Sequence, residues 1–485
     1  MSSYPRVATF KTVESFRAHL AKLGLKIQCE DTIETAPESP LAAPMTVDGF
    51  RVGNRFTIHP MEGWDGETDG RPSELVRRRW RNFGRSGAKW IWGGEAMAVL
   101  PDSRANPNQL IISEETQDGL AKLLEELLET HRIEFGSTDD LLVGFQLTHS
   151  GRFSKPFRKD KPEPKILYRH QVLDRKFGLG DDYPVLTDDD IRRIIDRFIA
   201  AGKIAEECGA KFVDVKHCHG YLGHEFLSSH TRPGPYGGSF ENRTRFLREV
   251  VQGIRSSTKK IKIAVRMSAF DLIPFHPDAS RREGTKLGPG IPDQFSGVYR
   301  YGFGVDADDP TDYDLSETEQ FVTLLQELGI RMLNVSGGSP YYNPHIQRPA
   351  LFPPSDGYQP PEDPLVGCAR QIEVAAAIKK RFPGMTVVGT AYSYLQEYLP
   401  QVAQWAVRTG RTDSVGLGRV VLSYPTLPRD VLVSGSLETK RVCRTFSDCT
   451  TGPRNGMISG CFPLDPYYRN LPEAAEIKRV KAEFR

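Results

Sequence analysis

Several side chains that can donate or accept protons lie at the end of one short apolar segment of the chain. Phe212–Val215 is rich in β-branched and aromatic residues, so we expect it to form a strand. Four proton-carrying side chains follow it within six positions: Lys216, His217, His219 and Tyr221. In a parallel α/β architecture catalytic residues collect at the carboxyl ends of strands, and these four groups span different pKa ranges. The stretch therefore predicts an active site at this strand end.

The same residues also have a structural interpretation. Alternate residues of a strand share one face, so Asp214 and Lys216 lie on the same side and can form an ion pair. A single histidine near a strand end is more often a hydrogen-bonded structural group than a catalyst. The clustering of several such groups in a glycine-punctuated segment favours function. The sequence leaves open whether Lys216 is bound to Asp214.

Strand and helix patterns alternate along most of the chain, as in successive βα units. We expect strands at Arg55–Ile58, Trp90–Trp92, Leu141–Thr148, Phe212–Val215, Ile261–Met267, the RMLNVS segment before Gly337, Thr386–Thr390 and Val415–Arg419. We expect helices at Val13–Leu25, Glu115–Thr130, Ile191–Cys208 and Glu241–Ile254, and a further helix that ends at Gly329. Thr187 is expected to cap one of these helices, and a capping box of Ser316 with Glu319 is expected to begin the last.

Composition bounds the class of protein. The 485 residues are 39% hydrophobic and 26% charged, which is typical of a globular enzyme, and the net charge of +2 gives no argument for nucleic-acid or membrane binding. No apolar run approaches the length of a membrane span, and the N-terminus lacks a signal-peptide core. Seven scattered cysteines do not resemble a disulfide framework. We therefore expect a cytoplasmic protein with reduced thiols, a small-molecule substrate and a homo-oligomeric state.

The motifs HGYL, EFLS, YGGS, ENR and RF, which begin at His219 and occur in that order up to Phe246, resemble the Old Yellow Enzyme family of FMN-dependent oxidoreductases. The resemblance covers roughly residues 47–469 and implies a (β/α)8 barrel with FMN at the carboxyl ends of its strands. It implies that Lys216 and His219 hold the activated oxygen of the substrate and that Tyr221 supplies a proton. The family has a histidine where this chain has Lys216. NADH or NADPH is implied as a transient electron donor. The sequence contains no GxGxxG fingerprint of a dinucleotide-binding domain, which agrees with a transient donor.

Two buried polar residues suit a flavin. Gln146 lies in the apolar run LLVGFQLT, where an unpaired amide costs roughly 1–3 kcal/mol, and the family's glutamine at this place binds the flavin pyrimidine edge. Arg266 lies in the strand IKIAVRM, and a buried arginine needs an anionic or acceptor partner. The resemblance places Arg266 where negative charge develops on reduction. Its structural alternative is a salt bridge within the barrel.

The resemblance implies the remaining flavin contacts. Further residues expected beside the ring are Pro60, Met61, Glu62 and Ala96. Residues expected near the phosphate are Ser336, Gly337, Gly338, Ala391, Tyr392, Gly418 and Arg419. Short glycine pairs present N–H groups that suit a phosphate, and barrels commonly bind phosphate after their last two strands. Glu62 departs from the small hydroxyl or thiol usual in the family, and its carboxylate suits a cationic substrate or opposes anionic reduced flavin.

The C-terminal segment contains Cys443, Cys449 and Cys461, which resemble the iron–sulfur segment of the trimethylamine dehydrogenase and 2,4-dienoyl-CoA reductase branch. That branch has four cysteines, and Phe446 stands at the second position here. Loss of a ligand argues against a cluster. We expect a degenerate remnant and assign no metal ligands, with another metal as the open alternative.

The expected organisation has an N-terminal extension at residues 1–45, the barrel at 46–435 and the cysteine-containing tail at 436–485. A loop insertion at 272–315 is expected to form a lid or a subunit contact. The expected activity is hydride transfer from a reduced nicotinamide through FMN to an activated unsaturated substrate. Two alternatives are an FMN-dependent amine dehydrogenase or N-demethylase, and a barrel that only binds ligands.

Overall fold

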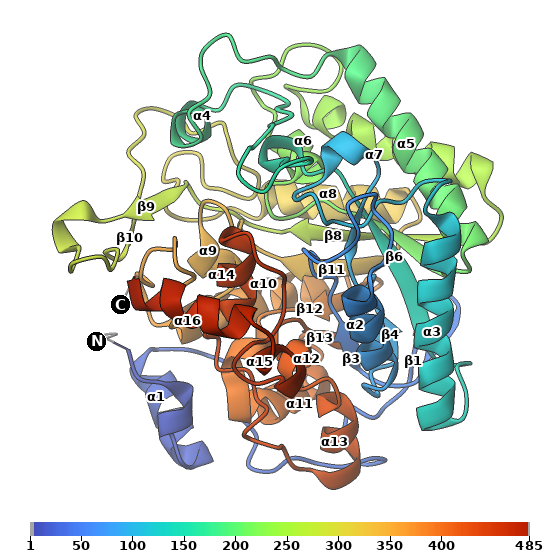
Figure 1. The fold of residues 1–485 in the computed structure, drawn as a ribbon, viewed down its shortest axis with the longest axis vertical. Coiled ribbons are helices and arrows are strands. Elements are labelled where there is room, and N and C mark those ends of the chain that lie inside the picture. The colour runs from blue at the N-terminus through green and yellow to red at the C-terminus, as the bar shows by residue number, and fades with distance from the viewer. Residues whose placement is uncertain (1–3, 484–485) are drawn as a thin grey trace.

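The computed structural model describes residues 4–483, and its centre is a closed barrel of eight parallel strands (Figure 1). The barrel strands are β3 (Phe56–Ile58), β4 (Trp90–Ile91), β6 (Leu142–Thr148), β7 (Phe212–Val215), β8 (Lys262–Ser268), β11 (Met332–Ser336), β12 (Thr386–Gly389) and β13 (Ser414–Leu417). Pairing of β4 with both β3 and β6 closes the ring, and β5 (Ala96–Ala98) pairs with the end of β6. The expected (β/α)8 barrel is confirmed.

Amphipathic helices surround the strands (Figure 1). The longer ones are α2 (Glu74–Gly84), α3 (Gln117–Phe135), α5 (Asp188–Glu207), α7 (Phe240–Ser257), α8 (Ser316–Glu327), α10 (Pro364–Arg381), α11 (Leu399–Arg408) and α13 (Leu427–Ser434). Short helices in the loops are α4 (Gln171–Lys176), α6 (Leu222–Leu227), α9 (Pro344–Gln347) and α12 (Val420–Ser423). None of the helices in residues 4–483 combines the length and hydropathy that a membrane span requires.

Helix caps show where local sequence signals hold. Thr187 and Asp190 form the reciprocal capping box that begins α5. The capping box expected of Ser316 with Glu319 is wrong, because Ser316 is already the first residue of α8 and its hydroxyl donates to Asp314 Oδ1 at 2.7 Å. Leu315 stands at the N-cap position, and Asp314 before it accepts the Ser316 N–H at 2.9 Å.

The two ends of the chain pack on the barrel. Helix α1 (Val13–Lys22) docks through Phe16, whose ring stacks on Tyr398 with centroids 4.2 Å apart. The antiparallel hairpin of β1 (Met45–Val47) and β2 (Phe50–Val52) packs on the apolar residues at the amino ends of the barrel strands. At the other terminus α14 (Asp448–Arg454), α15 (Pro466–Arg469) and α16 (Glu473–Glu483) lie across the carboxyl ends of the strands, on the side of the candidate site.

The 272–315 insertion contains the antiparallel hairpin of β9 (Phe275–Pro277) and β10 (Gly290–Pro292), which projects from the body in Figure 1. It is tied to the loop after β11, because the Phe275 N–H donates to the Tyr342 carbonyl at 2.8 Å. Its role as a lid or a subunit contact stays a prediction. All seven cysteines of the chain are free thiols, as expected.

A buried ion-pair cluster fixes the backbone after β3. Arg79 in α2 donates to both oxygens of Asp65 at 2.6 and 2.8 Å and to Glu95 at 2.8 Å, and all three residues are buried. The backbone at Gly63 is in close contact with this cluster, since a Cβ there would lie 2.2 Å from Glu95 Oε2. The cluster therefore fixes the segment after β3, which carries Met61 and Glu62 into the mouth of the barrel.

We expect Arg79→Met to lower the free energy of unfolding by about 3–5 kcal/mol, because it leaves two carboxylates buried without their counter-ion. The thermal or urea unfolding midpoint measures this loss. The matched control is Arg479→Met, since that arginine also bridges two carboxylates, Glu476 and Glu483, but its side chain is 61% exposed. The control should leave the midpoint unchanged, and equal effects of the two variants would contradict the assignment.

Candidate active site

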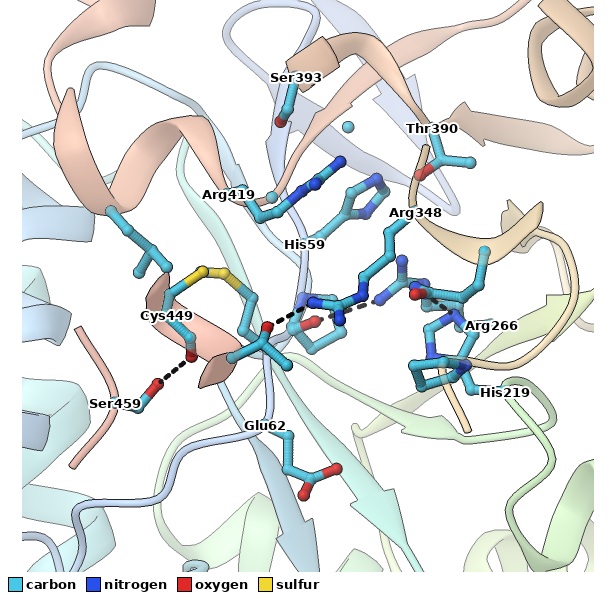
Figure 2. Close-up of a pocket in the computed structure, with 18 of the residues that line it drawn as sticks. His59, Glu62, His219, Arg266, Arg348, Thr390, Ser393, Arg419, Cys449 and Ser459 are labelled. Carbon is cyan, nitrogen blue, oxygen red and sulfur yellow. Dashed lines mark hydrogen bonds between the residues drawn. The ribbon is translucent and has the colours of Figure 1, made fainter. Parts of the chain in front are cut away.

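A cavity of about 250 Å³ opens at the carboxyl ends of the barrel strands (Figure 2). Its walls come from the residues that follow β3, β7, β11, β12 and β13, from side chains within β6 and β8, and from the C-terminal segment. Most of the sequence-predicted site residues line it: Pro60, Met61, Glu62, Gln146, Lys216, His219, Tyr221, Arg266, Ala391, Gly418 and Arg419. Six barrel strands thus bring to one place residues that lie up to 359 positions apart in the chain.

The expected phosphate-binding triplet Ser336–Gly338 is not among the described residues that line the cavity. The Gly338 N–H already donates to the Phe270 carbonyl oxygen at 2.9 Å. A Cβ on Gly337 would lie 2.5 Å from the ring of the same phenylalanine, so its missing side chain allows a close packing contact. The Gly338 N–H is thus bonded within the protein and Gly337 packs against Phe270, and phosphate binding by this triplet stays a prediction.

Ala96 and Tyr392 also lie outside the described lining of the cavity. The Ala96 N–H donates to the Met61 carbonyl at 3.1 Å, and its own carbonyl accepts from Gln109 Nε2 at 3.0 Å, so both backbone groups are already bonded. Tyr392, in the segment after β12, is buried. Its neighbour Ala391, at a left-handed φ of +73°, is the residue that reaches the cavity.

Asp214 in β7 is the hub of the cavity floor. Its Oδ2 accepts from Gln146 Nε2 at 2.6 Å and from Trp92 Nε1 at 2.8 Å, and its Oδ1 accepts from the Arg266 backbone N–H at 2.7 Å. Burial raises the pKa of this carboxyl, while the three donors act in the opposite direction. Both oxygens are therefore bonded without Lys216, and the ion pair that the sequence left open does not form within 4 Å.

Lys216 is 5% exposed and lines the cavity without an ion pair in the described residues. Its ammonium lies 3.7 Å from the centre of the Tyr221 ring, which is a cation–π contact. Burial lowers the pKa of Lys216, and the negative charge of Glu62 partly opposes that shift. The ammonium is thus a strong donor whose hydrogen-bonding capacity is left for a ligand.

Glu62 and Tyr221 form a hydrogen-bonded pair at one end of the cavity. The Tyr221 hydroxyl donates to Glu62 Oε2 and lies 2.8 Å from the Tyr341 hydroxyl. Asn106 Nδ2 donates to Glu62 Oε1 at 3.5 Å. Burial raises the pKa of Glu62 and, together with the adjacent carboxylate, raises the pKa of Tyr221. Glu62 therefore contacts the tyrosine that the sequence predicts as the proton donor.

His219 is held in a neutral state beside this pair. Its Nε2 lies 2.9 Å from Ser336 Oγ and 3.4 Å from Gln347 Nε2. Burial lowers its pKa well below the usual value, and the positive charges of Arg266 and Lys216 add to the shift. A left-handed φ of +66° places His219 at the turn after β7. The residue is available as a neutral hydrogen-bonding group in the cavity.

Arginines surround the opposite end of the cavity. Arg419 donates through Nη2 to the Pro349 carbonyl at 2.9 Å, and its Nη1 is buried with no partner in residues 4–483. Arg348 donates through Nη1 to Thr450, and its Nη2 is buried and unpartnered in the same way. Burial and the nearby Arg454 and Arg419 lower the pKa of Arg348 to about 9. Crowded guanidinium groups with vacant donors are typical of a phosphate site.

Several residues that line the cavity were not predicted as site residues: His59, Trp64, Gln347, Arg348, Thr390, Ser393 and Cys449. In Figure 2 Ser393 and Arg419 lie in the upper part of the view and Glu62 in the lower part, and the Arg348 side chain runs between them. The available signal for Arg348 was a lone cation in the apolar, proline-rich loop HIQRPALFPP. His59 immediately precedes Pro60, and burial lowers its pKa well below the usual value.

The cysteines of the tail contribute to the cavity through Cys449. Burial raises the pKa of Cys443 and Cys461, and neighbouring thiols add to the shift of each. Across residues 4–483 no three side chains of histidine, cysteine, aspartate or glutamate are placed to hold a metal ion together. The tail thus acts as a wall of the cavity, with Cys449, Thr450, Arg454 and Ser459 on its inner face.

The side chains present fit FMN. Gln146 donates through its amide nitrogen to Asp214, so its amide oxygen remains to accept a hydrogen bond from a ligand. Arg266 donates through Nη1 to the Pro60 carbonyl at 3.1 Å, and its Nε is buried and unpartnered within the described chain. These two residues would hold the polar edge of the flavin ring, and Arg348 with Arg419 would hold the phosphate. Buried donors without partners are costly unless a ligand satisfies them.

Comparisons with known proteins agree with this arrangement. Residues 40–281 match the model of the NADH:flavin oxidoreductase / NADH oxidase family. The NADPH dehydrogenase of Clostridium acetobutylicum is 33% identical over 232 residues, which are 47% of this chain and 63% of that protein. The NADPH dehydrogenase of Geobacillus sp. (strain WCH70) is 27% identical over 397 residues, or 81% of this chain and 93% of that protein.

Solved structures show the same fold. A 2-naphthoyl-CoA reductase in complex with 2-naphthoyl-CoA has a TM-score of 0.64 at 19% identity, over 89% of this chain and 57% of that chain. The Old Yellow Enzyme homologue from Zymomonas mobilis has a TM-score of 0.51 at 20% identity, over 80% of this chain and 91% of that chain. The expected family is confirmed: the chain belongs to the NADH:flavin oxidoreductase / NADH oxidase family, that of Old Yellow Enzyme.

Proposed function

We propose that the protein is an FMN-dependent oxidoreductase of the ene-reductase type, which uses NADH or NADPH to reduce an activated carbon–carbon double bond. The observation that carries the proposal is the convergence on one cavity of Gln146, Arg266, and Arg348 with Arg419, each of these last two having one buried nitrogen without a partner in residues 4–483. FMN, when bound, supplies hydride transfer from the nicotinamide to the substrate. The protein supplies binding, orientation and protons.

Three residues act on the substrate. Lys216 and His219 hold its activated oxygen, because both line the cavity and Lys216 has no carboxylate partner within 4 Å in the described chain. An ammonium beside that oxygen stabilises the negative charge that develops there on hydride addition. Tyr221, whose ring centre lies 3.7 Å from the Lys216 ammonium, supplies the proton. Burial of the whole group strengthens these interactions by excluding water.

The charge of the cavity favours this direction of electron flow over amine oxidation. Among residues 4–483, the lining carries five cationic residues and only Glu62 as a carboxylate. The cations are Lys216, Arg266, Arg348, Arg419 and Arg454. A cationic amine would need the face of Tyr221, which Lys216 already covers, and the Glu62 carboxylate, which Tyr221 already bonds.

The purified protein is expected to bind FMN and turn yellow. Anaerobic NADPH or NADH should bleach the flavin absorbance, and 2-cyclohexen-1-one should restore it, because the site stabilises an enolate oxygen. Trimethylamine should not reduce the oxidised enzyme. Reduction by the amine would support an amine dehydrogenase, and a protein that cannot be reconstituted with FMN would support a barrel that only binds other ligands.

Arg348→Gln is expected to weaken FMN binding by roughly 10- to 100-fold while leaving riboflavin binding unchanged, since a charge-assisted hydrogen bond to phosphate contributes about 1.5–3 kcal/mol. Quenching of flavin fluorescence measures both dissociation constants. Arg411→Gln is the control, because Arg411 is also half-buried but stacks on Trp405 outside the cavity. An equal loss of riboflavin and FMN affinity would show that Arg348 does not bind the phosphate.

Lys216→Met is expected to lower kcat/KM for 2-cyclohexen-1-one by roughly 10- to 100-fold, through loss of one charged donor to the oxygen. Methionine fills a similar volume without a buried charge, so the thermal midpoint should stay the same or rise. Lys122→Met, at an exposed position of α3, should change neither quantity. Unchanged kinetics in the Lys216 variant would remove this residue from the mechanism.

A further inference from the structure

We propose that Glu62 controls where the Tyr221 proton points and resupplies that proton during turnover, which makes Glu62 a catalytic acid of this site. The inference rests on the proposed function and adds a residue that neither the family resemblance nor the comparisons assign to acid catalysis. It rests on the hydrogen bonds that join Glu62, Tyr221 and Tyr341 in the cavity.

The Tyr221 hydroxyl has a single proton and more than one partner. It donates to Glu62 Oε2 when that carboxylate is ionised, and it can then accept from Tyr341, whose hydroxyl oxygen lies 2.8 Å away. In this arrangement the proton points at Glu62, and none is directed to a substrate. An ionised Glu62 therefore holds Tyr221 in an inactive orientation.

A protonated Glu62 reverses this hydrogen bond. Its carboxyl O–H donates to the Tyr221 oxygen, so the tyrosine proton is free to point into the cavity. The Tyr221 O–H bond then breaks, and its proton forms a C–H bond at the enolate carbon left by hydride addition to the other alkene carbon. The Glu62 proton passes to the tyrosine oxygen in the same step. Glu62 ends as a carboxylate, and water restores its proton before the next turnover.

Neighbouring groups define which oxygen of Glu62 faces Tyr221. Asn106 Oδ1 accepts the Asn108 N–H at 2.9 Å, so the Asn106 Nδ2 group is the one that donates, to the Gly63 carbonyl at 2.9 Å and to Glu62 Oε1 at 3.5 Å. Oε1 is thus the accepting oxygen, and Oε2 is left as the one that carries the proton toward Tyr221. The amide fixes the orientation that proton transfer requires.

The charges around Glu62 set its titration. Lys216 at the end of β7 faces it and favours the carboxylate, while burial favours the protonated form and raises its pKa. Tyr221 and Tyr341 are neutral hydrogen-bonding groups, and the Tyr341 ring is held by stacking on Phe153 with centroids 4.1 Å apart. The Arg79 cluster, behind Gly63, pairs its own two carboxylates and contributes no free cation to Glu62.

The wild-type rate of enone-dependent flavin reoxidation should be constant at low pH and fall with rising pH above the Glu62 pKa, by about tenfold for each pH unit. In Glu62→Gln the amide oxygen takes the place of Oε1 beside Asn106, so the NH2 group donates to Tyr221 at every pH. We expect this variant to lose the pH dependence and to reoxidise more slowly than the wild type does at low pH, because an amide can orient the Tyr221 hydroxyl but cannot pass a proton to its oxygen. Stopped-flow reoxidation of the photoreduced enzyme by 2-cyclohexen-1-one measures both.

Glu125→Gln, at an exposed position of α3, is the control and should keep the wild-type profile. An infrared carbonyl band of a protonated carboxyl group, present in the wild type at low pH and absent from Glu62→Gln, gives a second readout that does not depend on turnover. A variant that binds FMN, keeps the wild-type pH profile and changes only the flavin reduction potential would overturn the inference. A wild-type protein that binds no FMN or reoxidises with no enone would instead overturn the proposed function.

Discussion

The site depends on the buried carboxylate of Asp214. An ionised carboxyl group in a protein interior costs several kcal/mol unless donors satisfy it, and Asp214 collects three donors, from β6, from the residue after β4 and from the backbone of β8. These bonds join neighbouring strands at the floor of the cavity. They also decide that Gln146 presents its oxygen to a ligand and that Lys216 is left without a carboxylate.

The cavity has two ends with different electrostatic character. Arg348 and Arg419 crowd one end, where their vacant donors lower the cost of binding a phosphate dianion. The other end contains Lys216, Glu62 and Tyr221, whose charges and protons balance one another within a few ångströms. A ligand that spans both ends is fixed in direction by this difference, which is how a barrel with many similar loops can orient one cofactor.

The C-terminal segment completes the arrangement. Arg348 follows β11, yet its Nη1 bond goes to Thr450 in α14, so the tail helps to orient an arginine of the phosphate end. Cys449 and Ser459 close the same wall. The cysteine segment that resembles a cluster segment therefore contributes Cys449 to the cavity wall in this structure, and the Cys443 thiol lies near the positive charge of Arg419.

Local sequence determined the elements and much of the site. The βα alternation fixed the barrel, and Phe212–Val215 is a strand with the predicted bounds, because its apolar residues must be buried. Gln146 and Arg266 were predictable, since a polar group in an apolar strand requires a partner. The resemblance added the residues after Pro60 and the Gly418–Arg419 pair, which follow strand ends where ligands bind.

Only the tertiary structure decided the partners of these residues. The sequence allowed Lys216 to bind Asp214, and the alternative donors that exclude this pair come from strands far away in the chain. It could not show that Gly337 packs against the Phe270 ring or that the Gly338 N–H bonds the Phe270 carbonyl. It gave no reason to join Glu62 to Tyr221 or Arg348 to Arg419. Periodicity reports which face a side chain occupies, but hydrogen bonds and charge pairs depend on distances that only the closed barrel sets.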